Sequence, residues 1–370
     1  SNTPGNSYWP AIAADGLGNV HVAWEDGSTG RDILYMAKLA GSAAWAPPVN
    51  IANSPGTSRY VALTADSEGN VHAVWQDDTP GNTDIYYATR AASSGAWSPP
   101  AVVAATPMNS WGPTVAVDPD RGVHVAWHDF TPGVTEIYYA YKPSAAAAWS
   151  SPVNASRTTG ASYYPALAVD STGVVHLVWM DAITVGAGGS FKVLYAQKPS
   201  GGDWTPYTDL SRDTDSAEMP TLAIGAADAV HVAWDTTSEP RDLLYVRRPA
   251  PGMGWTTPVA VTSISAGAQN PVPSLAAATD ENAVHLVWSD FGALSQDILT
   301  SWAAPPPIPA DHVLVLDEHG WAVAGACVYR NGQATVATDE LGVFVPPALA
   351  VGDTLVALQP LAQQATVRQH

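Results

Sequence analysis

The fold is decided by the stretch Asp15-Gly-Leu-Gly-Asn-Val-His-Val-Ala-Trp24, because its pattern occurs six times in the chain. In each copy a tryptophan follows a histidine by three residues, and the histidines are His21, His72, His124, His176, His231 and His285. Subtraction of these numbers gives steps of 51, 52, 52, 55 and 54 residues. A period of this size indicates a repeat architecture.

Each copy is built from four short runs that are rich in β-branched and aromatic residues. In the first copy these runs are 10–15, 20–24, 32–37 and 45–51, separated by Gly, Asn, Asp, Ser and Pro. The turn from Asp15 to Asn19 suits a tight hairpin, with the aspartate capping the backbone and a glycine at positive φ. Four-stranded units repeated at this spacing predict an all-β fold, a six-bladed β-propeller over residues 1–303.

The sixth copy stops short, because 296–302 supplies its third strand and no Trp-x-x-Pro-Val run follows. Residues 304–310 form a stiff proline-rich linker. Residues 311–370 contain short runs joined by Asn-Gly and Asp-x-x-Gly turns, which predict a small, incomplete β-sandwich. We interpret both chain ends as cut, so that the sixth blade and the sandwich carry open strand edges that another chain could pair with.

Composition excludes several classes of partner. The formal charge is −19, and lysine occurs only at Lys38, Lys142, Lys192 and Lys198, which argues against nucleic acid as a partner. Cys327 is the only cysteine, so the chain has neither an internal disulfide framework nor a thiol cluster for a metal. No apolar run reaches the ~18 residues that a membrane-spanning helix requires.

The repeated histidines and carboxylates are interpreted as scaffold. Six equivalent histidines spread around a ring cannot converge on one ion or substrate, so we expect them to tie strands together. Carboxylates also recur on both sides of the hairpin between the second and third strands, as Asp77 and Asp84 do in the second copy. We expect capping of the loops, no cofactor and no metal; a Ca²⁺ ion bound by these oxygens is the alternative left open.

Positions at which the copies differ carry more information about function. Directly before the first strand, four copies present aromatic residues, which we expect at the mouth of the central channel beside carboxylates and arginines. Stacking faces next to charged hydrogen-bonding groups suit sugar recognition, and packing against the next blade is the alternative. The candidate ligand-binding residues are Tyr8, Trp9, Arg59, Tyr60, Trp111, Tyr163, Tyr164, Asp77 and Asp129.

The string Asp-x-x-Gly-x-Val-His-Val-x-Trp, followed by Asp-Ile-Tyr-Tyr-Ala and Trp-x-x-Pro-Val, resembles repeats of bacterial extracellular propellers of the sialidase-like superfamily, which carry neuraminidase-type repeats. The resemblance covers 1–303 and implies the fold more than an activity. The sialidase motif Ser-x-Asp-x-Gly-x-x-Trp is not present in that form, and the family's arginine clamp and its Tyr and Glu nucleophile pair have no assignable positions. Residues 311–370 resemble a carboxypeptidase-regulatory-like, transthyretin-type sandwich.

Three functions follow from these observations. The first is a secreted or cell-surface, non-catalytic protein that serves recognition or adhesion by binding a glycan or a surface protein. The second is a divergent sialidase-like glycosidase or lyase that uses Asp77 and Asp129 with Arg59, since a glycosidase needs two carboxyl groups across one bond. The third is a structural subunit that self-associates through its open strand edges.

Overall fold

The structure of the protein is a computed structural model, which describes most of residues 3–263 and shorter stretches beyond them. The described ranges are 3–28, 30–79, 81–143, 148–182, 190–212, 216–237, 242–263, 273–277, 284–291, 296–303, 313–314, 327–330, 333–337, 343–344 and 355–358. The chain forms two compact units, Ser1–Leu222 and Ala223–His370, which we call unit 1 and unit 2.

Unit 1 consists of repeated four-stranded antiparallel sheets, one for each of the first four copies of the sequence pattern. The first sheet contains β1 (Ser7–Ala14), β2 (Val20–Asp26), β3 (Asp32–Lys38) and β4 (Val49–Asn50). The second contains β5 (Ser58–Ala65), β6 (Val71–Asp77), β7 (Asp84–Arg90) and β8 (Ala101–Ala104). The third contains β9 (Ser110–Val117), β10 (Val123–Asp129), β11 (Glu136–Lys142) and β12 (Val153–Asn154). The fourth contains β13 (Ser162–Val169), β14 (Val175–Asp181), β15 (Lys192–Lys198) and β16 (Thr208–Asp209).

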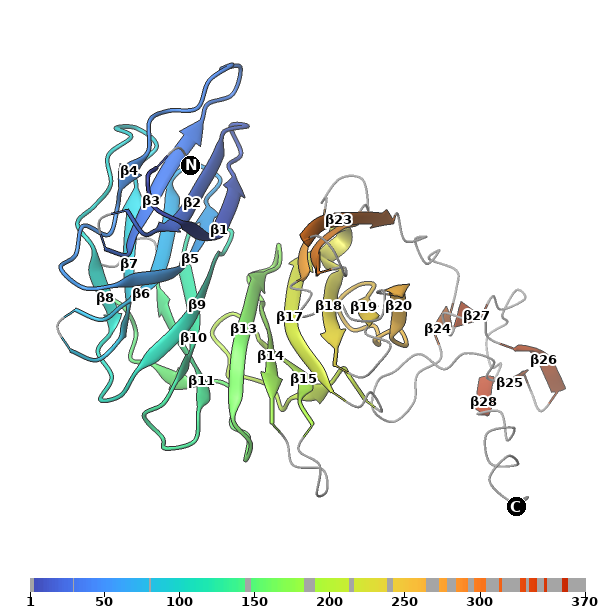
Figure 1. Ribbon diagram of the computed structural model, residues 1–370. Coiled ribbons are helices and arrows are strands. Elements are labelled where there is room, and N and C mark those ends of the chain that lie inside the picture. The colour runs from blue at the N-terminus through green and yellow to red at the C-terminus, as the bar shows by residue number, and fades with distance from the viewer. Residues whose placement is uncertain are drawn as a thin grey trace. The chain divides into compact units, whose positions relative to one another are not determined.

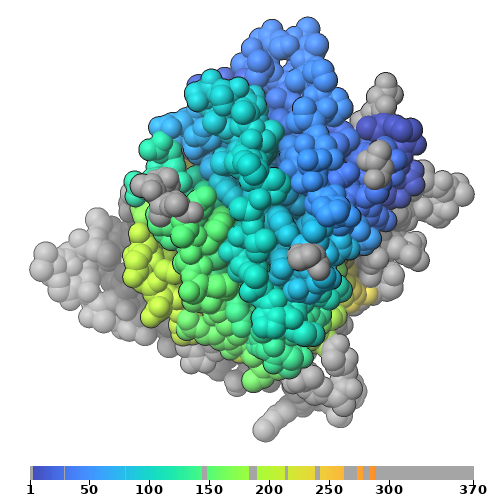
Figure 2. All heavy atoms as spheres, turned by 90° about the vertical axis from the view of Figure 1, so that its left-hand side faces the viewer, coloured from blue at the N-terminus to red at the C-terminus, as the bar shows by residue number. Residues whose placement is uncertain are grey.

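The core of unit 1 lies between neighbouring sheets. Trp75 is fully buried against residues of the first sheet, Trp127 against the second and Trp179 against the third. The first strands β1, β5, β9 and β13 lie next to one another in chain order, and Figure 1 shows the sheets following from blue to green. On the face of unit 1 in Figure 2, the blue, cyan and green segments pack directly against each other. Face-to-face sheets in this order are the blades of a β-propeller, as predicted.

A backbone hydrogen bond joins each sheet of unit 1 to the next at one repeated place. The N–H of Ser58, which begins β5, donates to the carbonyl of Arg31 before β3 at 2.7 Å. The equivalent bonds run from Ser110 to Thr83, from Ser162 to Thr135 and from Ala217 to Phe191. The hairpin loop between the second and third strands therefore holds the start of the following sheet.

The fifth and sixth copies also form sheets. The fifth sheet has the order β17 (Ala217–Ile224), β18 (Val230–Thr236), β19 (Asp242–Arg248) and β20 (Val259–Ser263), and a short 3₁₀ helix, Ala226–Asp228, precedes β18. The described part of the sixth contains β21 (Pro273–Ala277), β22 (Val284–Phe291) and β23 (Gln296–Ala303). Trp234 and Trp288 of unit 2 are buried like their counterparts. The repeat thus gives the all-β fold that the sequence predicts.

The predicted linker, 304–310, lies outside the described residues, and so does most of the predicted sandwich. The described strands there are β24 (Val313–Leu314), which pairs with β27 (Val343–Phe344), and β25 (Cys327–Arg330) between β26 (Gln333–Ala337) and β28 (Leu355–Leu358). The domain boundaries, the sandwich and self-association through open edges stay predictions. Among the described residues, no helix is long and apolar enough to cross a membrane.

Candidate ligand-binding surface

Strands β1, β5, β9 and β13 each contain a β-bulge or register shift near their start. One residue there has positive φ in every first strand from β1 to β17: Trp9 (46°), Tyr60 (53°), Gly112 (57°), Tyr164 (48°) and Met219 (48°). A residue with a side chain loses about 1 kcal/mol in this left-handed conformation, and yet only the third copy uses glycine. We call this end of the sheets the bulge end, and the end with the Asp15–Asn19 turn and its equivalents the turn end.

The aromatic pairs predicted as ligand residues lie inside the first strands, not in loops before them. Strand β1 already begins at Ser7, which is the register partner of Asp26. Equivalent Ser–Asp pairs extend the hairpins of the next three sheets beyond the bulge. The sequence alone does not indicate this extension, because serine followed by an aromatic pair is typical of the end of a loop.

Several of these aromatic side chains are accessible at the bulge end. Tyr8 is 40 % exposed, Trp9 47 %, Trp111 39 % and Tyr164 42 %, whereas Tyr60 and Tyr163 are half-buried. The rings of Trp9 and Tyr60, from neighbouring sheets, lie 5.2 Å apart. Burial, followed by nearby Tyr60 and Glu218, raises the pKa of Tyr164. Rings from the first, second and fourth sheets therefore gather on one surface, which we call the aromatic surface.

His128 connects the remaining aromatic residues to this surface. Its ring lies 6.2 Å from Trp111, 5.8 Å from Tyr163 and 5.7 Å from Tyr164, measured between centroids. Burial lowers the pKa of His128 to about 4, against the opposing charge of Asp129. Among the described residues, the buried Nδ1 atom of His128 has no hydrogen-bond partner. The neutral imidazole thus packs beneath the aromatic rings and keeps one polar atom unused.

His128 belongs to a set of positions that sequence reasoning missed. The residue between the repeated tryptophan and aspartate is the register partner of the first residue of each predicted pair: Tyr8 with Glu25, Arg59 with Gln76, Trp111 with His128 and Tyr163 with Met180. This position differs in every copy although it lies inside the most uniform strand. That difference was the available signal, and it was hidden because the strand as a whole was interpreted as scaffold.

Two of these second-strand residues, Gln76 and Glu25, form polar contacts at the bulge end. The backbone N–H of Gly112, at the bulge of β9, donates to Gln76 Oε1 of the preceding sheet at 3.0 Å. Glu25 is fully buried and forms an ion pair with Arg31, whose guanidinium lies 5.4 Å above the ring of Tyr8. The bulge end therefore combines aromatic faces with fixed polar groups.

Arg59 is half-buried beside the aromatic pair position of the second sheet. Its Nε atom is buried and has no hydrogen-bond partner among the described residues. A buried donor without an acceptor is costly in a folded protein. The guanidinium of Arg59 can therefore supply a charged hydrogen bond to a bound oxygen at this surface.

Asp77 and Asp129 lie near the same end, but both side chains are fully buried. Ser58 Oγ donates to Asp77 at 2.5 Å, Ser110 Oγ donates to Asp129 at 2.8 Å, and Trp127 Nε1 donates to Asp129 at 3.0 Å. These bonds connect the first strand of a sheet to its second. A ligand role for the two aspartates stays a prediction.

The repeated histidines tie the second strand to the third at the turn end. In the first sheet His21 Nδ1 lies 2.7 Å from Tyr35 Oη, and Nε2 lies 3.2 Å from Asp15. The tyrosine contact recurs at 2.7 to 2.8 Å in His72–Tyr87, His124–Tyr139, His176–Tyr195 and His231–Tyr245. Among the described residues, no group of three or more His, Cys, Asp or Glu side chains could hold a metal ion.

No protein-family model matches the chain, and no curated protein matches its sequence. Solved structures do share the fold. A protein of unknown function from Dyadobacter fermentans superposes with a TM-score of 0.57 and 13 % identity, covering 81 % of this chain and 95 % of its own. An alpha-L-arabinanase of Penicillium chrysogenum, complexed with arabinobiose, gives 0.58 and 13 %, covering 80 % and 93 %. A leech intramolecular trans-sialidase gives 0.56 and 8 %, covering 81 % and 68 %. The chain therefore has a β-propeller fold of the kind found in sialidase and arabinanase structures.

Proposed function

We propose that the protein is a non-catalytic carbohydrate-recognition protein that binds a glycan on the aromatic surface of unit 1. The observation that carries the proposal is the gathering of exposed or half-buried rings at one repeated, bulged position, with Trp9 and Tyr60 5.2 Å apart. The apolar face of a sugar ring packs on aromatic rings, and its hydroxyls require fixed polar partners. Arg59 supplies such a partner beside the rings.

Backbone strain at the bulges supports the same proposal. Trp9, Tyr60 and Tyr164 adopt positive φ, which glycine adopts at the same position in the third sheet as Gly112. Strained positions that keep bulky side chains are characteristic of functional sites. Among the solved structures with this fold, the alpha-L-arabinanase is complexed with arabinobiose and the leech trans-sialidase with 2,7-anhydro-Neu5Ac, which agrees with the proposal.

The proposal places the protein outside the cell or on its surface, where glycans are displayed, and gives it a role in recognition or adhesion. A glycosidase on the same fold is the competing function. It requires two carboxyl groups facing one bond, roughly 5 to 10 Å apart. Asp77 and Asp129 are fully buried with partners in their own sheets, so they support anchoring more than hydrolysis.

A glycan array with matched tryptophan variants tests the proposal. Trp9→Ala removes a ring of the aromatic surface, whereas Trp45→Ala removes a similarly exposed ring of the same repeat, just before β4. We expect Trp9→Ala to weaken binding of the best array ligand at least about fivefold, and Trp45→Ala to leave it unchanged. The Trp111→Ala, Tyr163→Ala double variant should weaken it further.

Two kinds of result would contradict the proposed glycan recognition. Absence of any ligand on the array, or equal loss in Trp9→Ala and Trp45→Ala, contradicts recognition at this surface. Turnover of fluorogenic glycosides that disappears in Asp129→Asn, while the variant stays folded, favours the glycosidase instead.

A further inference from the structure

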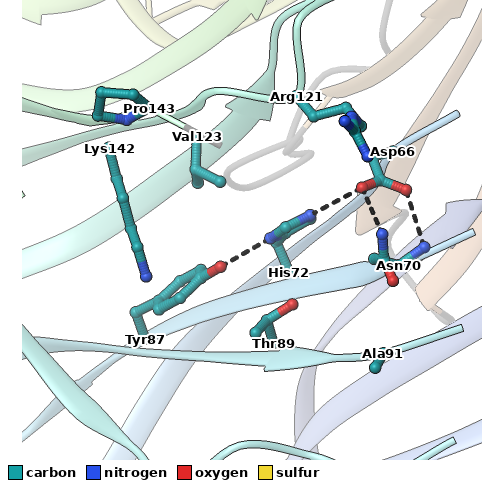
Figure 3. Close-up of a pocket in the computed structure, with 10 residues that line it drawn as sticks. All are labelled: Asp66, Asn70, His72, Tyr87, Thr89, Ala91, Arg121, Val123, Lys142 and Pro143. Atoms are coloured by element: carbon teal, nitrogen blue, oxygen red, sulfur yellow. Dashed lines mark hydrogen bonds and ion pairs between the residues drawn. The ribbon is translucent and has the colours of Figure 1, made fainter. Parts of the chain in front are cut away.

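A cavity lies at the turn end, between the second and third sheets of unit 1. It has a volume of about 380 Å³, and none of its lining residues belongs to the aromatic surface. Figure 3 shows His72 at its centre, between Tyr87 and Asp66, with the amino group of Lys142 above the tyrosine. Its lining includes His72, Tyr87, Thr89, Arg121, Val123 and Lys142.

One of the side chains that line the cavity, Thr89, is small. Thr89 on β7 is the register partner of His72, and Tyr141 is the partner of His124 at the equivalent place in the third sheet. The Tyr141 ring lies 4.6 Å from the His124 ring, and its hydroxyl donates to Asp118 at 3.4 Å. The repeat can therefore fill this space with a tyrosine, and the second sheet does not.

A buried polar atom faces the hollow. His72 is only 7 % exposed, and its Nδ1 lies 2.8 Å from Tyr87 Oη. Its Nε2 lies 3.7 Å from Asp66, whereas the same contact is 3.0 Å at His124 and 3.2 Å at His176. Among the described residues, Nε2 of His72 has no hydrogen-bond partner. A ligand hydroxyl at this point would satisfy it.

Lys142 brings a positive charge to the other side of the cavity. Its Nζ lies 4.9 Å from the centre of the Tyr87 ring and 5.8 Å from that of Trp149. No carboxylate within ion-pair distance of Lys142 occurs in the part of the chain that the structure describes. Its repeat equivalent Lys198 differs, because its amino group donates to the carbonyl of Gly202. Lys142 is thus oriented by aromatic faces and keeps its donors for another group.

Arg121 adds a second positive charge to the cavity, from a turn position that is glycine in the other sheets of unit 1. It has φ of 65° at the turn position where Gly18, Gly69 and Gly173 have φ of 81°, 83° and 81°. An arginine there costs about 1 kcal/mol relative to glycine. Its ion pair with Glu68 is exposed on both sides, and such a pair contributes about 1 kcal/mol at most. The arginine therefore has no clear structural advantage over the repeat's own glycine.

We propose that this cavity binds a small hydroxylated carboxylate of monosaccharide size, a hexuronate. The carboxylate lies beside Lys142, whose amino group has no carboxylate partner among the described residues and forms charge-assisted hydrogen bonds to it. Arg121, which Figure 3 shows on the side of Asp66, donates to a hydroxyl of the sugar. A hydroxyl bonds to Nε2 of His72, and the ring packs between Tyr87 and Val123. Asp66 is held by Asn70 at the far end and repels the carboxylate, which fixes the orientation.

Calorimetric titration with D-glucuronate tests the site, with glucose and glucose 1-phosphate as comparison ligands. Lys142→Met keeps most of the length of the side chain and removes the charge, and we expect it to weaken glucuronate binding on the order of tenfold or more. Lys38→Met, at the equivalent place in the first sheet, is the matched control and leaves the affinity unchanged. Glucose is expected to bind far more weakly than glucuronate.

Two further variants take their substitutions from the repeat itself. Thr89→Tyr copies Tyr141 and fills the cavity, so binding should be lost. Arg121→Gly restores the repeat's glycine, so it should weaken binding while the melting temperature stays the same or rises. Because this last variant relieves strain, its loss of binding cannot be attributed to unfolding.

Several results would overturn the proposal. Absence of glucuronate binding, equal affinity for glucose, or unchanged affinity in both Lys142→Met and Arg121→Gly contradicts an anion site here. Binding of glucose 1-phosphate without glucuronate replaces the carboxylate with a phosphate and refutes the assignment. The Trp9→Ala variant should keep glucuronate binding in this cavity, which separates this site from the aromatic surface.

Discussion

At both ends of each sheet in unit 1 the backbone conformation repeats from copy to copy. The side chains are uniform at the turn end and variable at the bulge end. At the turn end, aspartate, histidine and tyrosine occupy the same positions in successive sheets, and His21, His124 and His176 all lie within hydrogen-bond distance of the aspartate of the turn. At the bulge end the left-handed residue is also repeated, yet it is Trp9, Tyr60, Gly112 or Tyr164. Uniform side chains indicate scaffold, whereas variable side chains on a uniform backbone indicate a surface adapted to a ligand.

Each copy adopts the same left-handed backbone at the bulge, and this conformation is unfavourable only for a residue with a side chain. A left-handed residue other than glycine is unfavourable wherever it occurs. If the bulge only closed the hairpin, glycine, as at Gly112, would be the more favourable residue at this position in every sheet. The aromatic residues at this position therefore require a reason other than the fold.

The largest expected effect comes from the scaffold tryptophan of the third sheet. Trp127→Ala removes a fully buried ring from the core between two sheets, so the free energy of unfolding should fall by about 3 to 5 kcal/mol. Trp111→Ala in the same sheet removes a ring that is 39 % exposed and should cost roughly 1 kcal/mol or less. Urea unfolding of both variants checks this; equal losses would erase the distinction between the two ends.

A smaller loss is expected from the buried aspartate beside the bulge. Asp129→Ala leaves Ser110 Oγ and Trp127 Nε1 without their acceptor, which should cost about 3 kcal/mol. Thermal and urea unfolding give the value. If Asp129→Ala instead keeps full stability and loses glycan binding, the aspartate is a ligand residue and not an anchor.

Gly112 distinguishes the third sheet from its neighbours. A Cβ atom at this position would lie 2.9 Å from His128 Cε1, and His128 is itself packed against Trp111 and Tyr163. Gly112→Ala should therefore destabilise unit 1 by about 2 kcal/mol. Gly133→Ala serves as the control. No atom lies within 4 Å of a Cβ atom added at Gly133, so only the positive φ opposes this change.

The pH dependence of stability provides a test of His128. Burial lowers its pKa from 6.5 to about 4, so between these values the unfolded chain binds a proton that the folded chain does not. The free energy of unfolding should therefore fall as the pH is lowered from 6.5 towards 4. His231 contributes in the same direction, since burial lowers its pKa to about 4 as well. His128→Gln should flatten the dependence only in part, as urea unfolding between these pH values would show; an unchanged slope would contradict the buried neutral imidazole.

The smallest effect on stability is expected at the bulge itself. Tyr60→Gly relieves the left-handed strain but loses the contact with Trp9, so the free energy of unfolding should change by less than about 1 kcal/mol. Glycan binding should nevertheless weaken. A strong destabilisation by this variant would mean that the aromatic surface is part of the core.

The period of the sequence predicted the repeated strands and the use of the histidines as ties, because both depend on contacts within one copy. It did not locate the bulge, since a one-residue shift in register leaves the composition unchanged. Gln76 and His128 were overlooked because their meaning depends on the neighbouring strand or sheet. The cavity beside Thr89 was invisible for the same reason, as it exists only between two copies.

The hydrogen bond from the start of each sheet to the hairpin of the preceding one has a consequence for how such a chain can change in evolution. The bond uses only backbone atoms, so this contact does not depend on the side chains of either copy. Duplication or loss of one whole copy preserves the donor and the acceptor at the new junction. The number of blades is therefore not fixed by this hydrogen bond. Duplication of a copy can lengthen the array while every existing bond between sheets is kept.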